Sequence, residues 1–372
     1  MTSQSLLIII ATNYTSQMDN SFFLRSHTES VELKRFHICT WEFNNNSSLV
    51  EFGIEVKSSS LKDHDELTLE LYIPWFEKGC VTKDFYDKLK SSDNSRFIFN
   101  DSVSSTSSFD GGQNARGVIH DFSGRQKLCL LPAIIKSDFK NHKVLLNLEL
   151  SDYKSKADEE TNLYIRIGVE PKTETISTKK KGIGKSTIIY DIKVNEERNI
   201  PNSLLNEFNS NFPCSIETCF CFHIVPNNYN ITFFESEHLK NVRALEFEPF
   251  KNYLDDKRLK KDELIVVFSK KSGSESYTFF SIYTKERIGA SQFAVAILIN
   301  IICGFLFALP SIRNQKPNEV PLRDMLKYPP IEFYLAVILA LSVLIYFFYP
   351  SLFIAFRKGF NWIVSFLPNK KR

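Results

Sequence analysis

The sequence lacks the features that mark several large classes of protein. Its seven cysteines form an odd set without the spacing of a disulfide framework. The N-terminal segment has no basic region ahead of a long apolar stretch, so we expect no secretory signal and reduced thiols in a cytosol-facing domain. The formal net charge is only +3 in 372 residues, which gives the chain no general attraction to nucleic acid.

A recognisable catalytic constellation is also missing. The run Gly184-Lys185-Ser186-Thr187 has the last residues of a phosphate-binding loop, but Lys179 stands where that loop needs glycine. A strand-like run follows instead of the helix whose N-terminus would bind phosphate. We interpret the segment as a basic turn, and Lys179, Lys180, Lys181 and Lys185 as candidate contacts for a polyanion. We predict that the protein is not an enzyme and uses no cofactor.

One group of residues has the character of metal ligands. On a strand, Cys219, Cys221 and His223 would share one face, with Cys214 a short distance before them. Zinc takes such ligands, but the second pair of a zinc knuckle is missing from the sequence. We therefore favour a strand with a buried thiol face and predict no metal site.

What the sequence has in quantity is the composition of strands. Phenylalanine is frequent, at 33 residues, whereas glycine, at 13, is scarce. The run Glu66–Phe76 alternates so that Leu67, Leu69 and Leu71 face one side. Similar runs, separated by polar turns, predict a mainly β fold of β-sandwich type, divided into subdomains at residues 1–140 and 141–287. The other predicted strands are Val31–Trp41, Leu49–Lys57, Arg96–Asn100, Lys127–Leu131, Lys143–Leu150, Asn162–Val169, Thr187–Val194, Cys219–Val225, Ile231–Glu235, Leu264–Ser269 and Tyr277–Thr284.

Helices are expected to be few and short before residue 288. Thr82–Lys90, Asn202–Asn209 and Phe250–Lys261 are the candidates, and the polar segment Ser91–Gln113 is interpreted as a long surface loop.

Two apolar runs, Ile288–Leu309 and Ile331–Phe356, reach the ~20 residues that a helix needs to cross a bilayer. They predict a C-terminal transmembrane hairpin over residues 288–356, followed by a basic interfacial tail at residues 357–372. The outer flanks of the two runs carry more basic residues than the loop that connects them, which predicts cytoplasmic N and C termini. The expected interfacial anchors are Arg357, Lys358, Trp362, Lys370, Lys371 and Arg372.

Small or polar residues recur every four positions in the predicted hairpin: Ala296, Asn300, Gly304 and Ala308 in the first run, Ala336 and Ala340 in the second. Such stripes let helix backbones approach closely in lipid. Two interpretations remain open. The stripes pack the two helices of one hairpin together, or they drive assembly into an oligomer that lines a pore.

This order of parts, an enzyme-free β-rich region followed by the hairpin Ile288–Phe356, resembles the two-transmembrane-helix effectors of bacterial anti-phage systems of the retron type. The resemblance implies a multi-pass inner-membrane toxin whose β-rich domain senses or binds a partner and whose hairpin permeabilises the membrane. It also implies a homo-oligomer in the lipid bilayer, inhibited by a reverse transcriptase–DNA complex. The alternative is a membrane-anchored binding scaffold without pore activity.

Overall fold

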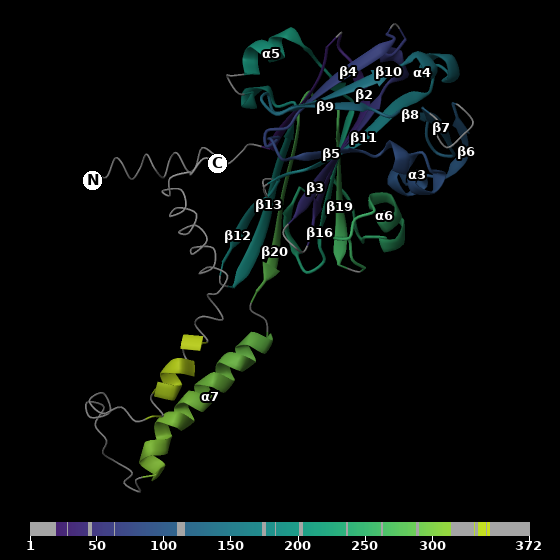
Figure 1. The fold of residues 1–372 in the computed structure, drawn as a ribbon. Helices are drawn as coiled ribbons and strands as arrows, with labels where there is room; N and C mark the ends of the chain where they lie inside the picture. The colour runs from purple at the N-terminus through teal and green to yellow at the C-terminus, as the bar shows by residue number, and fades with distance from the viewer. Residues whose placement is uncertain are drawn as a thin grey trace, which may run out of the picture. The chain divides into compact units, whose positions relative to one another are not determined.

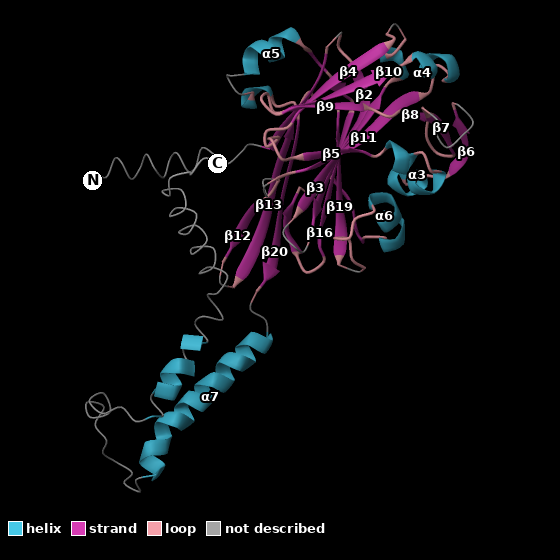
Figure 2. Cartoon of the chain, in the orientation of Figure 1, coloured by secondary structure: helices cyan, strands magenta, loops and turns pink. Residues whose placement is uncertain are grey.

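A computed structural model describes residues 20–27, 29–43, 47–62, 64–109, 116–172, 176–182, 184–200, 204–235, 237–261, 263–287, 290–313, 331, 334–339 and 341–342 (Figure 1). The chain divides into two compact units. The first comprises Met1–Thr178 and Ile188–Tyr283, and the second comprises Lys179–Thr187 and Thr284–Arg372. Strands dominate the first unit (Figure 2).

Two sheets organise the strands, and each takes strands from before and after residue 140. The nine-stranded sheet has the order β17-β20-β13-β1-β4-β10-β9, with β12 beside β13 and β14 beside β1. Its strands are β1 (Asn20–Ser26), β4 (Glu66–Tyr72), β9 (Ile134–Asp138), β10 (Lys143–Glu149), β12 (Thr178–Lys181), β13 (Lys185–Val194), β14 (Phe212–Pro213), β17 (Asn230–Phe234) and β20 (Tyr277–Glu286).

The eleven-stranded sheet has the order β18-β19-β16-β2-β3-β11-β8-β7-β6, with β15 beside β2 and β5 beside β11. Its strands are β2 (Glu32–Glu42), β3 (Ser48–Val56), β5 (Val81–Asp84), β6 (Val103–Ser108), β7 (Val118–Phe122), β8 (Leu128–Leu130), β11 (Asn162–Glu170), β15 (Ser215–Ile216), β16 (Thr218–Pro226), β18 (Leu239–Ala244) and β19 (Leu264–Ser272). The central pair β16 and β2 is parallel, so residues far apart in sequence lie side by side.

The main hydrophobic core lies between the two sheets. Leu67, Leu69 and Leu71 of β4 are buried in it, which confirms the predicted alternation of that strand. Phe22 of β1 meets Phe52 of β3 edge to face, with ring centroids 5.2 Å apart. Because the facing sides of both sheets supply one continuous apolar cluster, the predicted mainly β, sandwich-like fold is confirmed for the described residues.

A second core covers the outer face of the eleven-stranded sheet. Three short helices supply it: α2 (Tyr86–Leu89), α3 (Ser92–Phe99) and α6 (Phe247–Leu254). The remaining helices of the first unit are α4 (Ser151–Lys156) and α5 (Leu205–Ser210), with short 3₁₀ turns η1 (Ser58–Ser60) and η2 (Glu197–Asn199). β2, β3 and β11 are consequently covered on both faces, which explains their nearly continuous burial.

Segment Ser91–Gln113 corrects two expectations. We expected a long surface loop here and a strand at Arg96–Asn100. The chain instead forms helix α3 and then strand β6. Asn100 ends the helix in the left-handed conformation, at φ 51°, and its N–H bonds back to the carbonyl groups of Arg96 and Phe97. Asparagine tolerates this conformation, so a single residue both caps the helix and turns the chain.

The predicted transmembrane hairpin is wrong. The first apolar run forms α7 (Ala290–Arg313), whose sequence includes Asn300, an amide that is costly in hydrocarbon, and Pro310, which lacks a backbone donor. Most of the second run lies outside the described residues. Among the described residues, no helix combines the length and the apolar character needed to cross a bilayer. The multi-pass inner-membrane localisation depended on this hairpin and is also wrong.

Candidate functional site

A cavity lies on the outer face of the eleven-stranded sheet, beneath α3 and α6. Its volume is about 430 Å³, within the range of small-molecule sites. β2, β11, β16, β18 and β19 form its floor and wall, and the ends of α3 and α6 cover it. The lining residues are Arg35, His37, Cys39, Phe97, Ile98, Phe99, Asn100, Arg125, Arg166, Phe220, Phe222, Ile224, Lys240, Asn241, Arg243, Phe250, Val266 and Phe268. Five of these described lining residues are cationic, six are phenylalanines, and none is acidic.

Strand pairing brings the polar part of the floor together. β3 lies between β2 and β11, and Gly53 is opposite both His37 and Arg166. Alternation then places Glu51 and Glu55 of β3 on the same side as Gly53. The sequence LVEFGIEV thus puts two carboxylates on the cavity side of a strand whose other side is apolar core.

Glu51 is the centre of the first polar network. Its carboxylate is fully buried and accepts hydrogen bonds from Trp41 Nε1 at 2.6 Å, Arg166 Nε at 2.6 Å and the Tyr253 hydroxyl at 2.7 Å. Tyr253 comes from α6, so this carboxylate joins the sheet to the helix above it. Arg166 reaches on to the Tyr164 hydroxyl at 3.2 Å. Satisfied buried networks of this kind fix side-chain positions.

Gly53 makes room for the next link. The Tyr164 hydroxyl lies 3.2 Å from His37 Nδ1, directly over the Gly53 backbone. A Cβ atom at residue 53 would stand 2.1 Å from that hydroxyl oxygen and 3.0 Å from His37 Nδ1. Only glycine lets Tyr164, His37 and Arg166 occupy their places across three strands.

Glu55 is the centre of the second network. It accepts a hydrogen bond from Arg125 at 2.7 Å and one from Asn162 at 2.9 Å, and Arg35 lies 3.6 Å away. Two guanidinium groups therefore share one buried carboxylate, while Arg166 has Glu51 to itself. Arg125 also lies over the ring of Phe99, 4.9 Å from its centroid.

The floor is left with an excess of positive charge. Three guanidinium groups face two carboxylates, and the side chain of Arg125 is only 9% exposed. Its Nε is a buried donor without a hydrogen-bond partner among the described residues. Burial and the nearby Arg35 lower the pKa of Arg125, although Glu55 opposes both effects. An unpaired buried donor and a surplus cation together favour an anion in the cavity.

Aromatic rings form the apolar wall. Phe222 of β16 and Phe268 of β19 are stacked with their centroids 4.6 Å apart and their planes 6° from parallel, and the centroid of Phe220 lies 5.8 Å from that of Phe268. All three rings are partly exposed, although most of this sheet face is covered by helices. Phe97 and Phe250 approach the cavity from α3 and α6.

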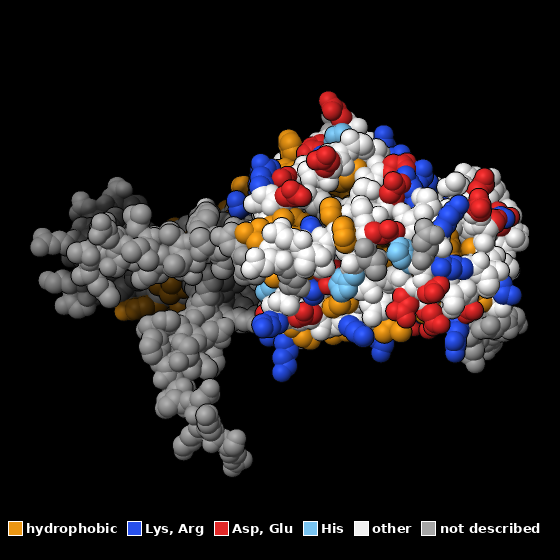
Figure 3. Space-filling model, turned by 90° about the horizontal axis from the view of Figure 1, so that it is seen from above, with side chains coloured by type: hydrophobic (Ala, Val, Ile, Leu, Met, Phe, Trp, Pro, Cys, Tyr) orange, Lys and Arg blue, Asp and Glu red, His pale blue; other side chains and the backbone are white. Residues whose placement is uncertain are grey.

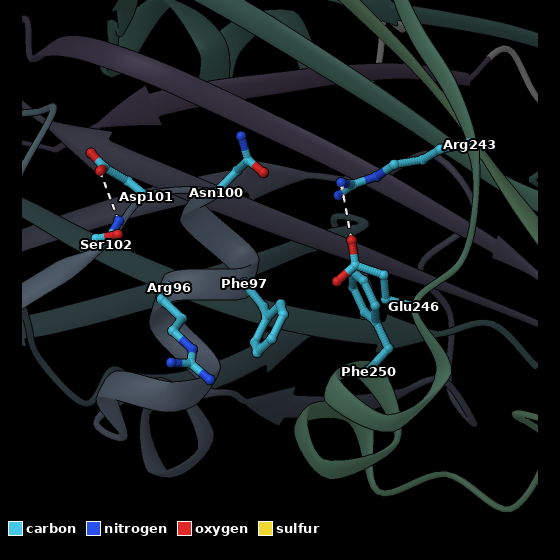
Figure 4. A pocket seen from close by; sticks show the side chains of 8 residues that line it. All are labelled: Arg96, Phe97, Asn100, Asp101, Ser102, Arg243, Glu246 and Phe250. Carbon is cyan, nitrogen blue, oxygen red and sulfur yellow. Dashed lines mark hydrogen bonds and ion pairs between the residues drawn. The ribbon is translucent and has the colours of Figure 1, made fainter.

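A second cavity of about 290 Å³ adjoins the first and shares Phe97, Asn100, Arg243 and Phe250 with it (Figure 4). Arg243 of β18 pairs with Glu246 at 3.2 Å on the α6 side. Arg96, Asp101 and Ser102 continue the lining on the α3 side. The two cavities therefore form adjoining lobes of one site.

Two titratable groups of the main cavity, His37 and Cys39, are held in their uncharged forms. Burial, with the three arginines nearby, lowers the pKa of His37 well below its usual value. Burial and Glu51 raise the pKa of Cys39 far above its usual value. Nucleophilic cysteine needs the opposite, a thiolate beside an imidazolium. His37 and Cys39 therefore do not have the ionisation states of a nucleophilic cysteine–histidine pair.

The residues singled out in the sequence lie elsewhere. Lys179, Lys180 and Lys181 are on β12 and Lys185 begins β13, and both Lys180 and Lys185 are exposed. Their role as a polyanion contact stays a prediction. Glycine 184 precedes a strand rather than a helix, as the sequence indicated.

The cysteine and histidine cluster lies on β16, on the core side of the sheet. Cys219, Cys221 and His223 are buried, and Cys221 Sγ lies 3.5 Å from His223 Nε2. His223 Nδ1 bonds to Thr40 at 2.9 Å, and its ring stacks on Tyr190. Within the described ranges, no group of three or more His, Cys, Asp or Glu side chains could hold a metal ion. Phe220 and Phe222 point the other way, into the cavity.

The stripe residues of the first apolar run lie on α7, where Asn300, Gly304 and Ala308 are exposed and Ala296 is half-buried. Ala336 is buried. Ala340 and the interfacial anchors Arg357, Lys358, Trp362, Lys370, Lys371 and Arg372 lie outside the described residues.

Sequence reasoning missed Arg35, Arg125 and Arg166. The signal that could have found Arg166 is its place inside the otherwise apolar strand NLYIRIGVE, which matches Glu51 and Glu55 inside LVEFGIEV. Charges inside strands that are buried on both faces must pair with one another. No sequence pattern could have added the phenylalanines of β16 and β19 to the same cavity.

Comparisons with known proteins assign the chain to no class. No family model matches it, and no curated protein matches it either. The fold and the cavity are therefore the basis for any statement about function.

Proposed function

We propose that the β-rich unit is a binding module whose ligand is a small anion held in the cavity beneath α3 and α6. The observation that carries this proposal is the lining itself, which has five cationic side chains and no acidic one among the described residues. Arg125 adds a buried Nε donor that has no protein partner in the described part of the chain.

The charge of the cavity contrasts with that of the surface. Acidic and basic side chains are interspersed over the face seen in Figure 3. The lining of the main cavity, by contrast, carries charges of one sign. Guanidinium groups match the planar oxygen pairs of carboxylates and phosphates, so three of them at one floor favour such a ligand.

This proposal keeps one part of the function expected from the sequence, which is a β-rich domain that binds or senses a partner. Permeabilisation of a membrane and a lipid bilayer as partner depended on the transmembrane hairpin and are not carried forward. The resemblance to anti-phage effectors, the homo-oligomer, the inhibitory reverse transcriptase–DNA complex and the absence of enzymatic activity stay predictions.

Thermal unfolding of the full chain in the presence of pyrophosphate, citrate or sulfate tests the proposal. A ligand at 100 times its Kd stabilises the folded state by about 2.7 kcal/mol. For a unit of this size that corresponds to a rise in Tm of roughly 5–10 °C. We expect at least one of the three anions to produce such a rise.

Two variants localise the effect. Arg35→Gln removes a half-exposed cation from the cavity and should abolish most of the rise, while Glu55 keeps Arg125 and Asn162 as partners. Lys34→Gln removes the same charge from the neighbouring position of β2, where Lys34 pairs with Glu217 outside the cavity. An equal rise in both variants would contradict the proposed site, and no rise with any of the three anions would contradict the proposed function.

A further inference from the structure

We infer that the ligand is a small nucleotide, whose phosphate binds at the arginine floor and whose base stacks against the phenylalanines of the sheet. This inference rests on the proposed function and narrows it to one chemical class. Its basis is that one lining holds both the guanidinium groups around Glu55 and the stacked phenylalanines of β16 and β19, so one molecule with a charged end and a planar end could contact both.

The charged end would meet Arg35 and Arg125. Both belong to the Glu55 network, where two guanidinium groups share a single carboxylate. A phosphate placed there supplies the second anionic partner and an acceptor for the Arg125 Nε donor. Phosphate offers several oxygens to a planar guanidinium fork, and this pairing is a strong, charge-assisted contact.

The planar end would meet the ring row of β16 and β19. Phe222 and Phe268 are stacked on one another, with their planes 6° from parallel, and both are partly exposed, so a base could extend the stack. Phe97 and Phe250 approach from the helices on the other side of the cavity and line both of its lobes. Every nucleobase has a flat π-face that can stack on an aromatic side chain. Such stacking holds bases without reading their identity.

Two amides lie within reach of a stacked base. Asn100 follows α3 and Asn241 lies on β18, and both line the main cavity. An amide both donates and accepts hydrogen bonds, which suits the mixed edge of a base. The cavity thus has charge, stacking surface and directional polar groups in one place.

The dimensions favour a small nucleotide over a nucleic acid strand. The two lobes have volumes of about 430 and 290 Å³. These volumes are those of small-molecule sites, whereas a strand needs a basic track along the surface.

Isothermal titration of the full chain tests the inference with adenosine, guanosine and uridine 5′-monophosphates against ribose 5-phosphate, which has the phosphate but no ring. We expect at least one nucleotide to bind more tightly than ribose 5-phosphate. Phe222→Leu should weaken the nucleotide by about 5- to 100-fold, the range of one lost stacking contact, and leave ribose 5-phosphate within about twofold. Arg35→Gln should weaken both.

Matched variants guard against a general loss of structure. Phe222→Tyr keeps the ring and should keep nucleotide affinity. Phe233→Leu removes a 47% exposed phenylalanine that contacts Phe280 on the other sheet, and should change nothing. The urea midpoint of each variant is measured alongside its affinity.

Each outcome decides between the two proposals. Equal affinity for nucleotides and ribose 5-phosphate, or tighter binding of a hexathymidylate strand that Phe222→Leu weakens, overturns the small nucleotide as ligand. Absence of nucleotide binding together with an Arg35-dependent thermal shift in pyrophosphate overturns the nucleotide but keeps the anion-binding function. Absence of both overturns both.

Discussion

Replacing Gly53 by alanine should damage the cavity floor more than any other single added methyl group. The new Cβ would stand 2.1 Å from the Tyr164 hydroxyl oxygen, so the tyrosine ring has to move. Overpacking of a core costs typically 1–3 kcal/mol. The displaced hydroxyl also loses its 3.2 Å contacts with His37 and Arg166, and stranding buried polar groups costs about 1–3 kcal/mol more. We expect Gly53→Ala to lower the free energy of unfolding by about 3–5 kcal/mol.

Urea unfolding followed by tryptophan fluorescence measures this change. Trp41 and Trp75 are both buried in the first unit, and Trp41 bonds to Glu51 in the affected network. Gly184→Ala is the matched control, because a Cβ there meets nothing within 4 Å. It should stay within about 0.5 kcal/mol of the parent protein.

A double-mutant cycle with Tyr164→Phe separates the clash from other effects. Tyr164→Phe alone should cost about 1–2 kcal/mol for its two hydrogen bonds. In that background the oxygen that Cβ would strike is absent, so adding Gly53→Ala should cost at least 1 kcal/mol less than it does in the parent. Strict additivity of the two substitutions, or a Gly53→Ala protein as stable as the control, would refute the reasoning.

Three further predictions concern buried ionisable side chains. Arg166→Met leaves the Glu51 carboxylate without its cation and should lower the free energy of unfolding by about 3–5 kcal/mol, whereas adding Glu51→Gln should restore part of it in the same urea assay. Burial lowers the pKa of His223 to about 3 in the folded protein. As the pH falls below 6.5, this histidine is therefore protonated in the unfolded chain but not in the folded one. Stability should therefore fall by about 1.4 kcal/mol per pH unit from this residue, about 2 kcal/mol by pH 5, and His223→Leu should flatten urea midpoints over that range. Burial acts to raise the pKa of Glu70, but hydrogen bonds from three neighbours outweigh it and the net pKa is lowered. The ionised carboxylate therefore stabilises the fold above pH 4.5, and this stabilisation is lost as the pH falls. Glu70→Gln should be less stable than the parent at pH 7 and should lose this acid sensitivity in the same titration.

The sequence predicted the strands far better than it predicted their partners. The predicted Val31–Trp41 and Leu49–Lys57 correspond closely to β2 and β3, because alternation and β-branched residues are local signals. The parallel pairing of β2 with β16 has no such signal, since some 180 residues separate them. The prediction of a strand at Arg96–Asn100 was wrong for a related reason. Phenylalanines suit a strand, but they also suit a short helix that packs on a sheet, and this segment forms the end of α3.

The candidate site was out of reach of sequence reasoning for the same physical reason. Its arginines stand singly on three different segments, and their partners Glu51 and Glu55 become neighbours only through strand register. The apolar runs Ile288–Leu309 and Ile331–Phe356 gave the strongest local signal in the chain. That signal depends on apolar length alone, and the described structure does not bear out a bilayer-crossing helix.

The pairing of β2 with β16 also sets the order in which the protein can be completed during synthesis. β2 and β3 leave the ribosome early, but β16, β18 and β19 follow only after residue 217. Until then, one side of β2 lacks its long parallel partner, and the phenylalanine wall does not exist. Contacts of such long sequence separation form slowly and leave partly folded chains prone to aggregation. A nascent chain therefore gains the complete cavity only after β19 has been synthesised, and a ligand that fits the cavity would stabilise chains that contain β19 and not chains truncated before it.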